Sequence, residues 1–293
     1  MAITYDTAGS TFDWSKVSAK GGDRAGPGTV YLKGSQQQYG SLSVDYKSSW
    51  MDRTVVKATQ VPAGRYDRFE VRNNAWVEVV GLLPEGSAVE VSGAGSSLML
   101  QGGVTHKLST LKVTGTNASV SVQPSADGQP LPLKLEVASV EVGTGASINA
   151  NAAGYLGGRR GVNGAQSGRT TGNVSTGRTD VGGSYGGHGR AQNGASVVPV
   201  YGDPLSPSDF GSGGSAQSNA SSKGGNGGGL LLLTVDSLKL DGALQANGEH
   251  SYAYGGAGGG IRLDVRSVTG SGFISAEGSP YDSLGYGTGG GGR

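Results

Sequence analysis

Residues 230–248 read LLLLTVDSLKLDGALQANG, and residues 260–278 read GIRLDVRSVTGSGFISAEG. The two stretches align without a gap when one is shifted by 30 residues. At four alternating or equivalent positions, apolar residues fall on apolar residues: Leu231, Leu233, Val235 and Leu244 on Ile261, Leu263, Val265 and Ile274. An ungapped internal repeat of this length predicts one structural unit that is used twice.

Within each unit, apolar and polar residues alternate, which is typical of a β-strand with one buried face. A Ser or Gly break follows the first strand, and a shorter strand with the pattern Leu/Ile-x-Ala comes after it. We expect Ala246 and Ala276 to occupy tight corners, where a larger side chain would not pack. This order of strands and turns predicts a coil of a single-stranded parallel β-helix, or β-solenoid.

Two further copies of the unit lie upstream. Residues 133–140 and 148–151 match it with a two-residue insertion, and residues 17–21 followed by 26–32 match it in part. We therefore expect an all-β fold and one domain over 1–293. Its predicted parts are a partial repeat at 1–34, solenoid coils at 35–151, a Gly-rich insertion at 152–229 and two 30-residue repeats at 230–293. The short strands expected between 35 and 130 could also build an antiparallel sandwich, but the neighbouring repeats favour a continuous solenoid.

Composition restricts the function. Glycine supplies 57 of 293 residues, far above the average of about 7%. The net charge of +1 argues against a nucleic-acid partner, and the chain has no cysteine for disulfides or Cys-ligated metals. No apolar run is long enough to span a membrane. We expect the chain to be a segment of a longer exported protein, because neither end has a capping sequence for a solenoid.

Several phrases resemble the Gly-rich β-helix repeats of very large bacterial cell-surface and secreted adhesin-like proteins. They are GTVYLK at 28–33, YGSLSVD at 39–45, YGDP at 201–204, GSGG at 211–214 and GGGIRLDV at 258–265. The resemblance implies an elongated extracellular or cell-surface stalk, and it supplies no catalytic residue.

The Gly-rich insertion carries a surplus of positive charge, with six basic residues against three acidic ones. Arginine pairs with carboxylate or sulfate, and tyrosine rings stack on sugars. This bias indicates a site for an acidic surface polysaccharide, whose candidate residues are Arg159, Arg160, Arg169, Arg178, Arg190, Tyr155, Tyr185 and Tyr201. In the alternative interpretation, these side chains only hold a Gly-rich loop in place and keep it soluble. Its many glycines also allow close main-chain hydrogen bonding.

Other chemistry has less support in the sequence. Residues 21–23 and 224–226 share part of a calcium-binding Gly-Gly-x-Gly-x-Asp repeat but lack its full spacing, so we expect no cofactor and no metal. Asp180, Asp203 and Asp209 are the insertion's acids, and they form no paired-carboxylate motif of a polysaccharide-degrading enzyme. The sequence thus predicts a non-enzymatic structural or adhesive segment, with carbohydrate binding as the alternative and glycan cleavage as a distant third.

Overall fold

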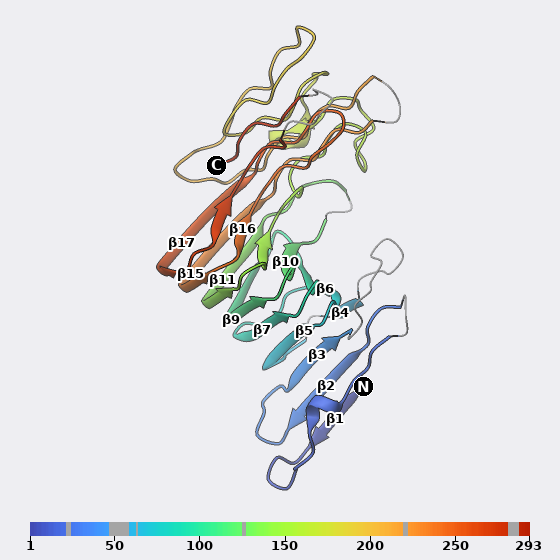
Figure 1. Ribbon diagram of the computed structural model, residues 1–293, viewed down its shortest axis with the longest axis vertical. Coiled ribbons are helices and arrows are strands. Elements are labelled where there is room, and N and C mark those ends of the chain that lie inside the picture. Colours follow the sequence, from blue (N-terminus) through green and yellow to red (C-terminus); the bar gives the residue numbers. More distant parts are fainter. Residues whose placement is uncertain (22–24, 47–58, 63, 125–126, 219–221, 281–286) are drawn as a thin grey trace.

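The structure is a computed structural model of the 293-residue chain, and it describes residues 1–21, 25–46, 59–62, 64–124, 127–218, 222–280 and 287–293. Figure 1 shows an elongated molecule, with the N-terminus at one end and long Gly-rich connections at the other. Strands lie across the long direction and follow one another in chain order along it.

The strands are short, as their Gly- and Asn-containing turns predict. Their bounds are β1 Ala2–Tyr5, β2 Thr29–Gly34, β3 Ser41–Asp45, β4 Thr59–Pro62, β5 Arg68–Arg72, β6 Trp76–Val80, β7 Ser87–Ser92, β8 Ser97–Leu100, β9 Thr105–Thr114, β10 Ser119–Val122, β11 Leu133–Val142, β12 Ser147–Asn149, β13 Arg169–Thr170, β14 Val174–Ser175, β15 Leu230–Leu240, β16 Ala243–Gln245, β17 Gly260–Thr269 and β18 Phe273–Ser275. Two 3₁₀ turns, η1 at Trp14–Lys16 and η2 at Thr171–Asn173, complete the described elements.

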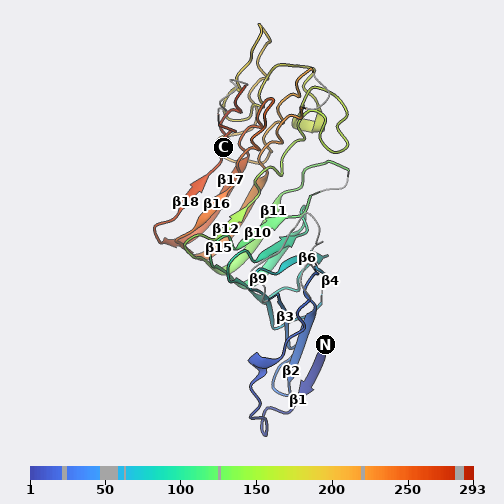
Figure 2. The same ribbon diagram turned by 45° about the vertical axis from the view of Figure 1, so that its right-hand side comes forward.

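Two sheets contain nearly all of these strands. The nine-stranded sheet has the order β1-β2-β3-β5-β7-β9-β11-β15-β17, and the seven-stranded sheet has the order β18-β16-β12-β10-β8-β6-β4. From β3 onward, apart from β13 and β14, the chain therefore visits the two sheets in turn. We call one strand of the larger sheet and the strand of the smaller sheet that follows it a layer. Figure 2 shows the two sheets side by side, with the last layer, β17–β18, nearest the Gly-rich end.

Neighbouring layers pair in parallel, with the register that the repeat predicts. Val235 lies beside Val265, and Leu244 beside Ile274. The 98-residue offset from Leu133 to Leu231 spans the insertion, yet β11 and β15 are still direct neighbours. The alternative of an antiparallel sandwich is wrong for β5–β12 and β15–β18, because every pairing between these strands is parallel.

The N-terminal segment departs from this pattern. β1 and β2 pair in parallel, but β2 and β3 pair in antiparallel fashion, and all three belong only to the nine-stranded sheet. Gly40, in the turn before β3, has a φ of +73°, which a residue with a side chain rarely adopts. The expected partial repeat at 1–34 is thus a strand addition to one sheet rather than a two-strand layer.

One continuous apolar core runs between the sheets, from Leu42 to Leu244. Alternating side chains of each strand supply it, as the burial of every second residue in β7 and β10 shows. The expected corner residue Ala246 is also fully buried, whereas Val265 and Ile274 in the last layer are only partly covered or exposed. The repeated unit therefore fills the core completely only in the inner layers.

The outward face of the nine-stranded sheet carries charges that alternate from layer to layer. Glu141 lies between Lys112 and Lys239 in register, with Nζ–carboxylate distances of 3.6 Å and 3.3 Å. Opposite charges directly across parallel strands favour this register, although each exposed pair contributes little. Among the described residues, no helix is long and apolar enough to cross a membrane.

Candidate functional site

Five Gly-rich runs pack side by side beyond the carboxyl ends of the short strands (Figure 1). We call them the glycine bundle, and their bounds are 154–158, 211–216, 224–229, 254–260 and 287–293. Three runs belong to the insertion, whereas the other two lead to or follow the last layer. The sequence contains this signal in its repeated runs GGNGGG at 224–229 and GGAGGG at 255–260.

Main-chain hydrogen bonds join the runs at intervals of three residues. The N–H groups of Gly225 and Gly228 donate to the carbonyls of Tyr254 and Ala257, at 2.9 and 2.8 Å. The next pair of runs repeats this spacing, with Gly255 and Gly258 donating to Gly287 and Gly290. A chain with three residues per turn, as in the polyproline II conformation, presents every third amide to the same neighbour. The bundle therefore has the hydrogen-bond period of packed threefold helices rather than of a β-sheet.

This packing requires the absence of side chains. A Cβ atom at Gly227 would overlap the carbonyl oxygen of Gly211, and one at Gly256 would overlap that of Asn226. The run 211–216 is buried along its whole length and exchanges hydrogen bonds with runs 154–158 and 224–229 and with residues 181–184. The insertion is thus ordered through main-chain contacts between glycines.

The three candidate tyrosines, Tyr155, Tyr185 and Tyr201, lie at the base of the bundle. Tyr155 and Tyr201 pack there with Leu230 and Leu232 of β15. The ring of Tyr155 lies edge-on to Phe210 at 5.7 Å, and the rings of Tyr185 and Tyr201 are 5.0 Å apart.

Hydrogen bonds hold the hydroxyls of Tyr155 and Tyr201 in place. The Tyr155 hydroxyl donates to the Asp209 carboxylate at 2.7 Å, and that of Tyr201 donates to the carbonyl of Phe210. Burial raises the pKa of Tyr155 and Tyr201 well above the ordinary value of 10.0.

These contacts correct the expectation that all three tyrosines present their rings to a sugar. Tyr155 and Tyr185 are fully enclosed, so neither ring has a free face, and only Tyr201 is partly exposed. The cluster is a small second core that anchors the insertion to the sheets. Phe210 and Leu230 also belong to this second core. The sequence pattern did not single out Phe210, because an isolated aromatic residue after a Pro- and Asp-rich stretch gives no periodic signal.

Two of the candidate arginines tie loops together. The Arg159 guanidinium donates from Nη1 to the carbonyl of Gln217 at 2.9 Å. Arg160 donates from Nε to the carbonyl of Gly224 and forms an ion pair with Glu249, with an Nη2–Oε1 distance of 2.8 Å. Glu249 lies outside the insertion, so its role as the partner of Arg160 is visible only in three dimensions.

The other three candidate arginines, Arg169, Arg178 and Arg190, lie in different parts of the insertion. The main chain of Arg169 bonds to Leu156 and Gly213, and that of Arg190 bonds to Gly182 and Thr288. Within the described part of the chain, Arg169 and Arg178 form no ion pair and both are partly exposed, whereas Arg190 is exposed. The structure therefore does not bring the five arginines together as one cluster.

The loops at the outer end of the bundle form a connected surface. We call them the distal loops, and they comprise residues 159–165, 178–180, 191–197, 217–218, 222–223 and 249–253. The Ser251 hydroxyl donates to the carbonyl of Lys223, and the Tyr254 hydroxyl donates to Asp180 at 2.9 Å. Figure 2 shows loops projecting at this end of the molecule.

Three of the eight described non-glycine residues with a left-handed φ lie in these loops. Arg159, Asp180 and Asn193 have left-handed φ values of 56°, 58° and 52°, a conformation that costs a residue with a side chain free energy. The Tyr252 ring is 73% exposed beside His250, with the ring centroids 5.8 Å apart. The distal loops therefore combine fixed backbones with exposed aromatic and polar side chains, which is typical of binding surfaces built on rigid scaffolds.

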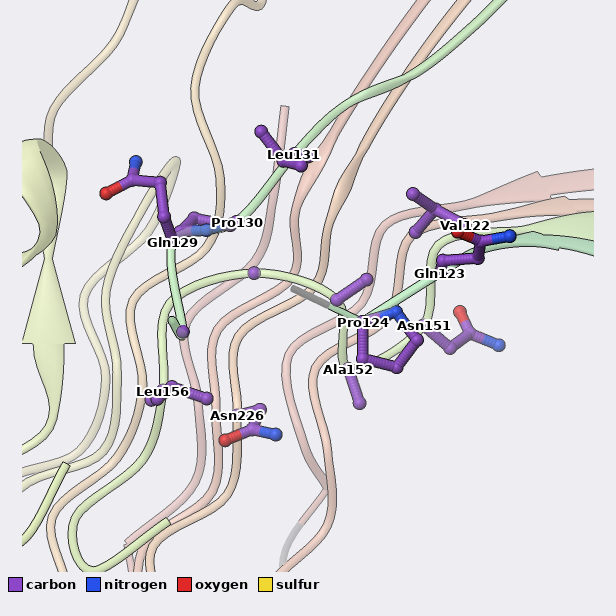
Figure 3. A pocket seen from close by; sticks show the side chains of 13 residues that line it. Val122, Gln123, Pro124, Gln129, Pro130, Leu131, Asn151, Ala152, Leu156 and Asn226 are labelled. Atoms are coloured by element: carbon purple, nitrogen blue, oxygen red, sulfur yellow. The ribbon is translucent and has the colours of Figure 1, made fainter. Parts of the chain in front are cut away.

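A cavity of about 200 Å³ lies where the layers meet the bundle (Figure 3). It is lined by the loop after β10, by residues 151–154 and 156, and by Asn226. Pro124, Pro130 and Leu131 give it an apolar wall, and Figure 3 shows Gln129 and Asn151 on opposite sides of it. No lining side chain is charged, so the cavity has no group that would select an acidic ligand.

The three acids of the insertion each have their own hydrogen-bond partner. Asp209 accepts from Tyr155 and Thr171, Asp180 accepts from Tyr254, and Asp203 accepts from the N–H of Leu205. In the described ranges, no group of three or more His, Cys, Asp or Glu side chains is arranged to hold a metal ion.

Comparison with known proteins gives no match: no family model, no curated protein and no solved structure is similar to this chain.

Proposed function

We propose that this chain is a stiff structural and adhesive segment of an exported bacterial surface protein, in which the stacked layers form a β-solenoid. The continuous core between the sheets carries this proposal. Because each described layer from β5 to β18 pairs in parallel with the next, the stack should bend little, and its stiffness would be passed to the glycine bundle. The bundle in turn holds the ends of the distal loops in fixed positions.

A binding experiment distinguishes an adhesive role from the role of a structural spacer. The chain is attached to beads, and their retention on bacterial and animal cell surfaces is compared with that of a variant whose residues 191–197 and 250–253 are replaced by Gly-Ser segments of equal length, so that the Arg160–Glu249 ion pair is kept. We expect retention to be lost in the variant while circular dichroism and thermal stability are kept. Equal retention of both proteins would contradict an adhesive role for these loops.

Binding of an acidic glycan through the insertion is the second candidate function. The supporting observation is that Arg169 and Arg178 are partly exposed and have no acidic partner among the described residues. Binding should weaken as salt rises, because exposed charge pairs are screened over about 8–10 Å at physiological ionic strength.

The matched variants are Arg178→Ala and Arg160→Ala, tested by titration with sulfated and carboxylated oligosaccharides. Arg178→Ala should weaken binding by roughly threefold to tenfold and reduce its salt dependence. Arg160→Ala should change stability more than affinity, because that side chain is already paired with Glu249. Affinity that ignores both salt and Arg178 would contradict the electrostatic mechanism.

A further inference from the structure

Asparagine is followed directly by glycine at four places in the chain: Asn163-Gly164, Asn193-Gly194, Asn226-Gly227 and Asn247-Gly248. In such a pair, the main-chain nitrogen of the glycine can attack the amide carbon of the asparagine side chain, and no Cβ atom of the glycine obstructs the attack. The reaction requires a side chain that is free to rotate and a main-chain nitrogen that is accessible. The four pairs differ in both respects.

Two of the pairs are held by hydrogen bonds at both groups. The Oδ1 atom of Asn226 accepts from the N–H of Gly157 at 2.9 Å, and the N–H of the following glycine donates to the carbonyl of Tyr155 at 2.9 Å. The Oδ1 atom of Asn247 accepts from the N–H of Glu277 at 2.8 Å, and the N–H of its following glycine donates to the Glu277 carbonyl at 2.9 Å. Neither side chain can turn toward its glycine without breaking these bonds.

A third pair is held through the asparagine alone. Asn163 is 4% exposed, and its Nδ2 group donates to the carbonyls of Gly157 and Ser167 at 2.9 and 3.0 Å. The space around Gly164 is open, because no atom lies near its future Cβ. Burial and two hydrogen bonds nevertheless fix the side-chain amide of Asn163 in place.

Asn193 lies in an exposed turn of the distal loops and is not held in this way. Asn193 and Gly194 have φ values of 52° and 75°, and the N–H of Ala195 donates to the carbonyl of Gln192 at 2.8 Å, as in a type I′ turn. Among the described residues, neither the Asn193 side chain nor the Gly194 N–H has a hydrogen-bond partner, and no atom lies within 4 Å of the Cβ position of Gly194. Opening this turn brings the two groups together, and it breaks a single hydrogen bond at the surface.

We propose that Asn193 is a site of spontaneous modification, at which the side-chain amide is converted to a carboxylate while the other three Asn-Gly pairs stay largely intact. The Gly194 nitrogen loses its proton to hydroxide and forms a bond to Cγ of Asn193. The bond from Cγ to Nδ2 then breaks, and ammonia leaves with a proton taken from water. Water opens the resulting five-membered succinimide ring at either of its two carbonyl groups, which gives aspartate or isoaspartate. The net reaction consumes water and releases ammonia, with no oxidation or reduction.

Either product changes the surface of the distal loops. The loop 191–197 gains a negative charge next to the loop of Asp180, since the N–H of Gln192 donates to the Asp180 carbonyl at 2.9 Å. Isoaspartate also inserts a methylene group into the main chain, so the turn from Gln192 to Ala195 cannot keep its geometry. This inference goes beyond the proposed function, because the reaction depends on the local structure of this loop and not on any ligand.

Peptide mapping of the full folded chain by mass spectrometry tests the proposal. The chain is incubated in mildly alkaline buffer, and succinimide, aspartate and isoaspartate are quantified at all four pairs over time. Asn193 should react roughly tenfold or more faster than the other three, and a tenfold ratio corresponds to about 1.4 kcal/mol, which is within the contribution of two hydrogen bonds. Asn193→Gln should abolish the reaction at this position and leave the slow rates elsewhere unchanged, because glutamine would have to close a larger ring.

Unfolding provides the matched control. In concentrated urea the four pairs lose their contacts, so all four should react at similar rates. A folded chain in which Asn193 reacts no faster than Asn163 would overturn the proposal. So would a folded chain in which none of the four pairs reacts while all of them react in urea, since the turn would then protect Asn193 as well. A lead of Asn193 that is equally large in urea would contradict the structural explanation of its selectivity.

Discussion

The layers and the glycine bundle are two solutions to the same problem, the packing of extended chain without helices. In the layers, apolar side chains fill the space between two sheets, and each strand is specified by its alternating pattern. In the bundle, main chains approach so closely that side chains are excluded, and hydrogen bonds recur every three residues. Substitutions should therefore have opposite effects in the two regions. The layers should lose stability when side chains are removed, and the bundle should lose stability when side chains are added.

The largest effect is expected in the bundle. Gly227→Ala should destabilise the chain by about 3 kcal/mol or more, because the added methyl group overlaps a backbone oxygen that cannot move aside. Gly164→Ala is the matched control, since no atom lies near its future Cβ and the effect should be close to zero. Urea unfolding followed by circular dichroism measures both. Similar losses at the two positions would show that the close approach of runs 224–229 and 211–216 is not needed for stability.

In the layers, one repeat position can be compared in two environments. Leu244→Ala should cost about 2–5 kcal/mol, because it opens a cavity in the continuous core. Ile274→Ala, 30 residues further along, should cost less than about 1 kcal/mol at low protein concentration, because that side chain is half exposed. Equilibrium unfolding of both variants gives the comparison. Equal losses would mean that Ile274 is covered in solution.

Acid sensitivity should distinguish the layers from the bundle, because the layers contain a buried histidine. His106 faces the core of β9, and its Nε2 lies 3.0 Å from the carbonyl of Gln101, to which the neutral ring donates. Burial lowers the pKa of His106 below its ordinary value of 6.5. The unfolded chain therefore binds a proton at a higher pH than the folded chain does.

Stability is then fully present above about pH 6.5 and decreases as the pH falls toward the lowered pKa, by about 1.4 kcal/mol for each unit of depression. His106→Leu should remove this part of the pH dependence between about pH 7 and pH 5, where few carboxylates titrate. Unfolding free energies at several pH values provide the measurement. An unchanged slope in the variant would exclude His106 as its source.

The smallest effect is expected on the outward face of the larger sheet. Glu141→Gln removes the negative charge between Lys112 and Lys239 and should cost less than about 1 kcal/mol, because exposed ion pairs are weak. The difference from wild type should vanish at high salt, where such charges are screened. Thermal unfolding at two ionic strengths measures it, with Glu78→Gln on the smaller sheet as the control. A large loss that persists in salt would point to a packing role for Glu141.

The sequence by itself determined the all-β class and the parallel register of the later layers. The alternation of apolar residues is a local property with a period of two, and the 30-residue repeat places Leu231 beside Ile261 and Leu244 beside Ile274, as the parallel pairing confirms. The same reasoning placed the insertion at 152–229, because apolar alternation stops there. These features depend only on which side chains follow one another, so they can be predicted without coordinates.

Only the tertiary structure decided the organisation of the candidate site. Glycine runs carry no side-chain pattern. The neighbours of each run therefore depend on the positions of the strands to which the run is connected. For the same reason, the burial of Tyr155 and Tyr185 and the pairing of Arg160 with Glu249 follow from long-range contacts that no local period encodes. The antiparallel step between β2 and β3 is another such feature, because an alternating strand pairs equally well in either direction. Side-chain periodicity thus specified the layers, whereas main-chain geometry specified the bundle and its loops.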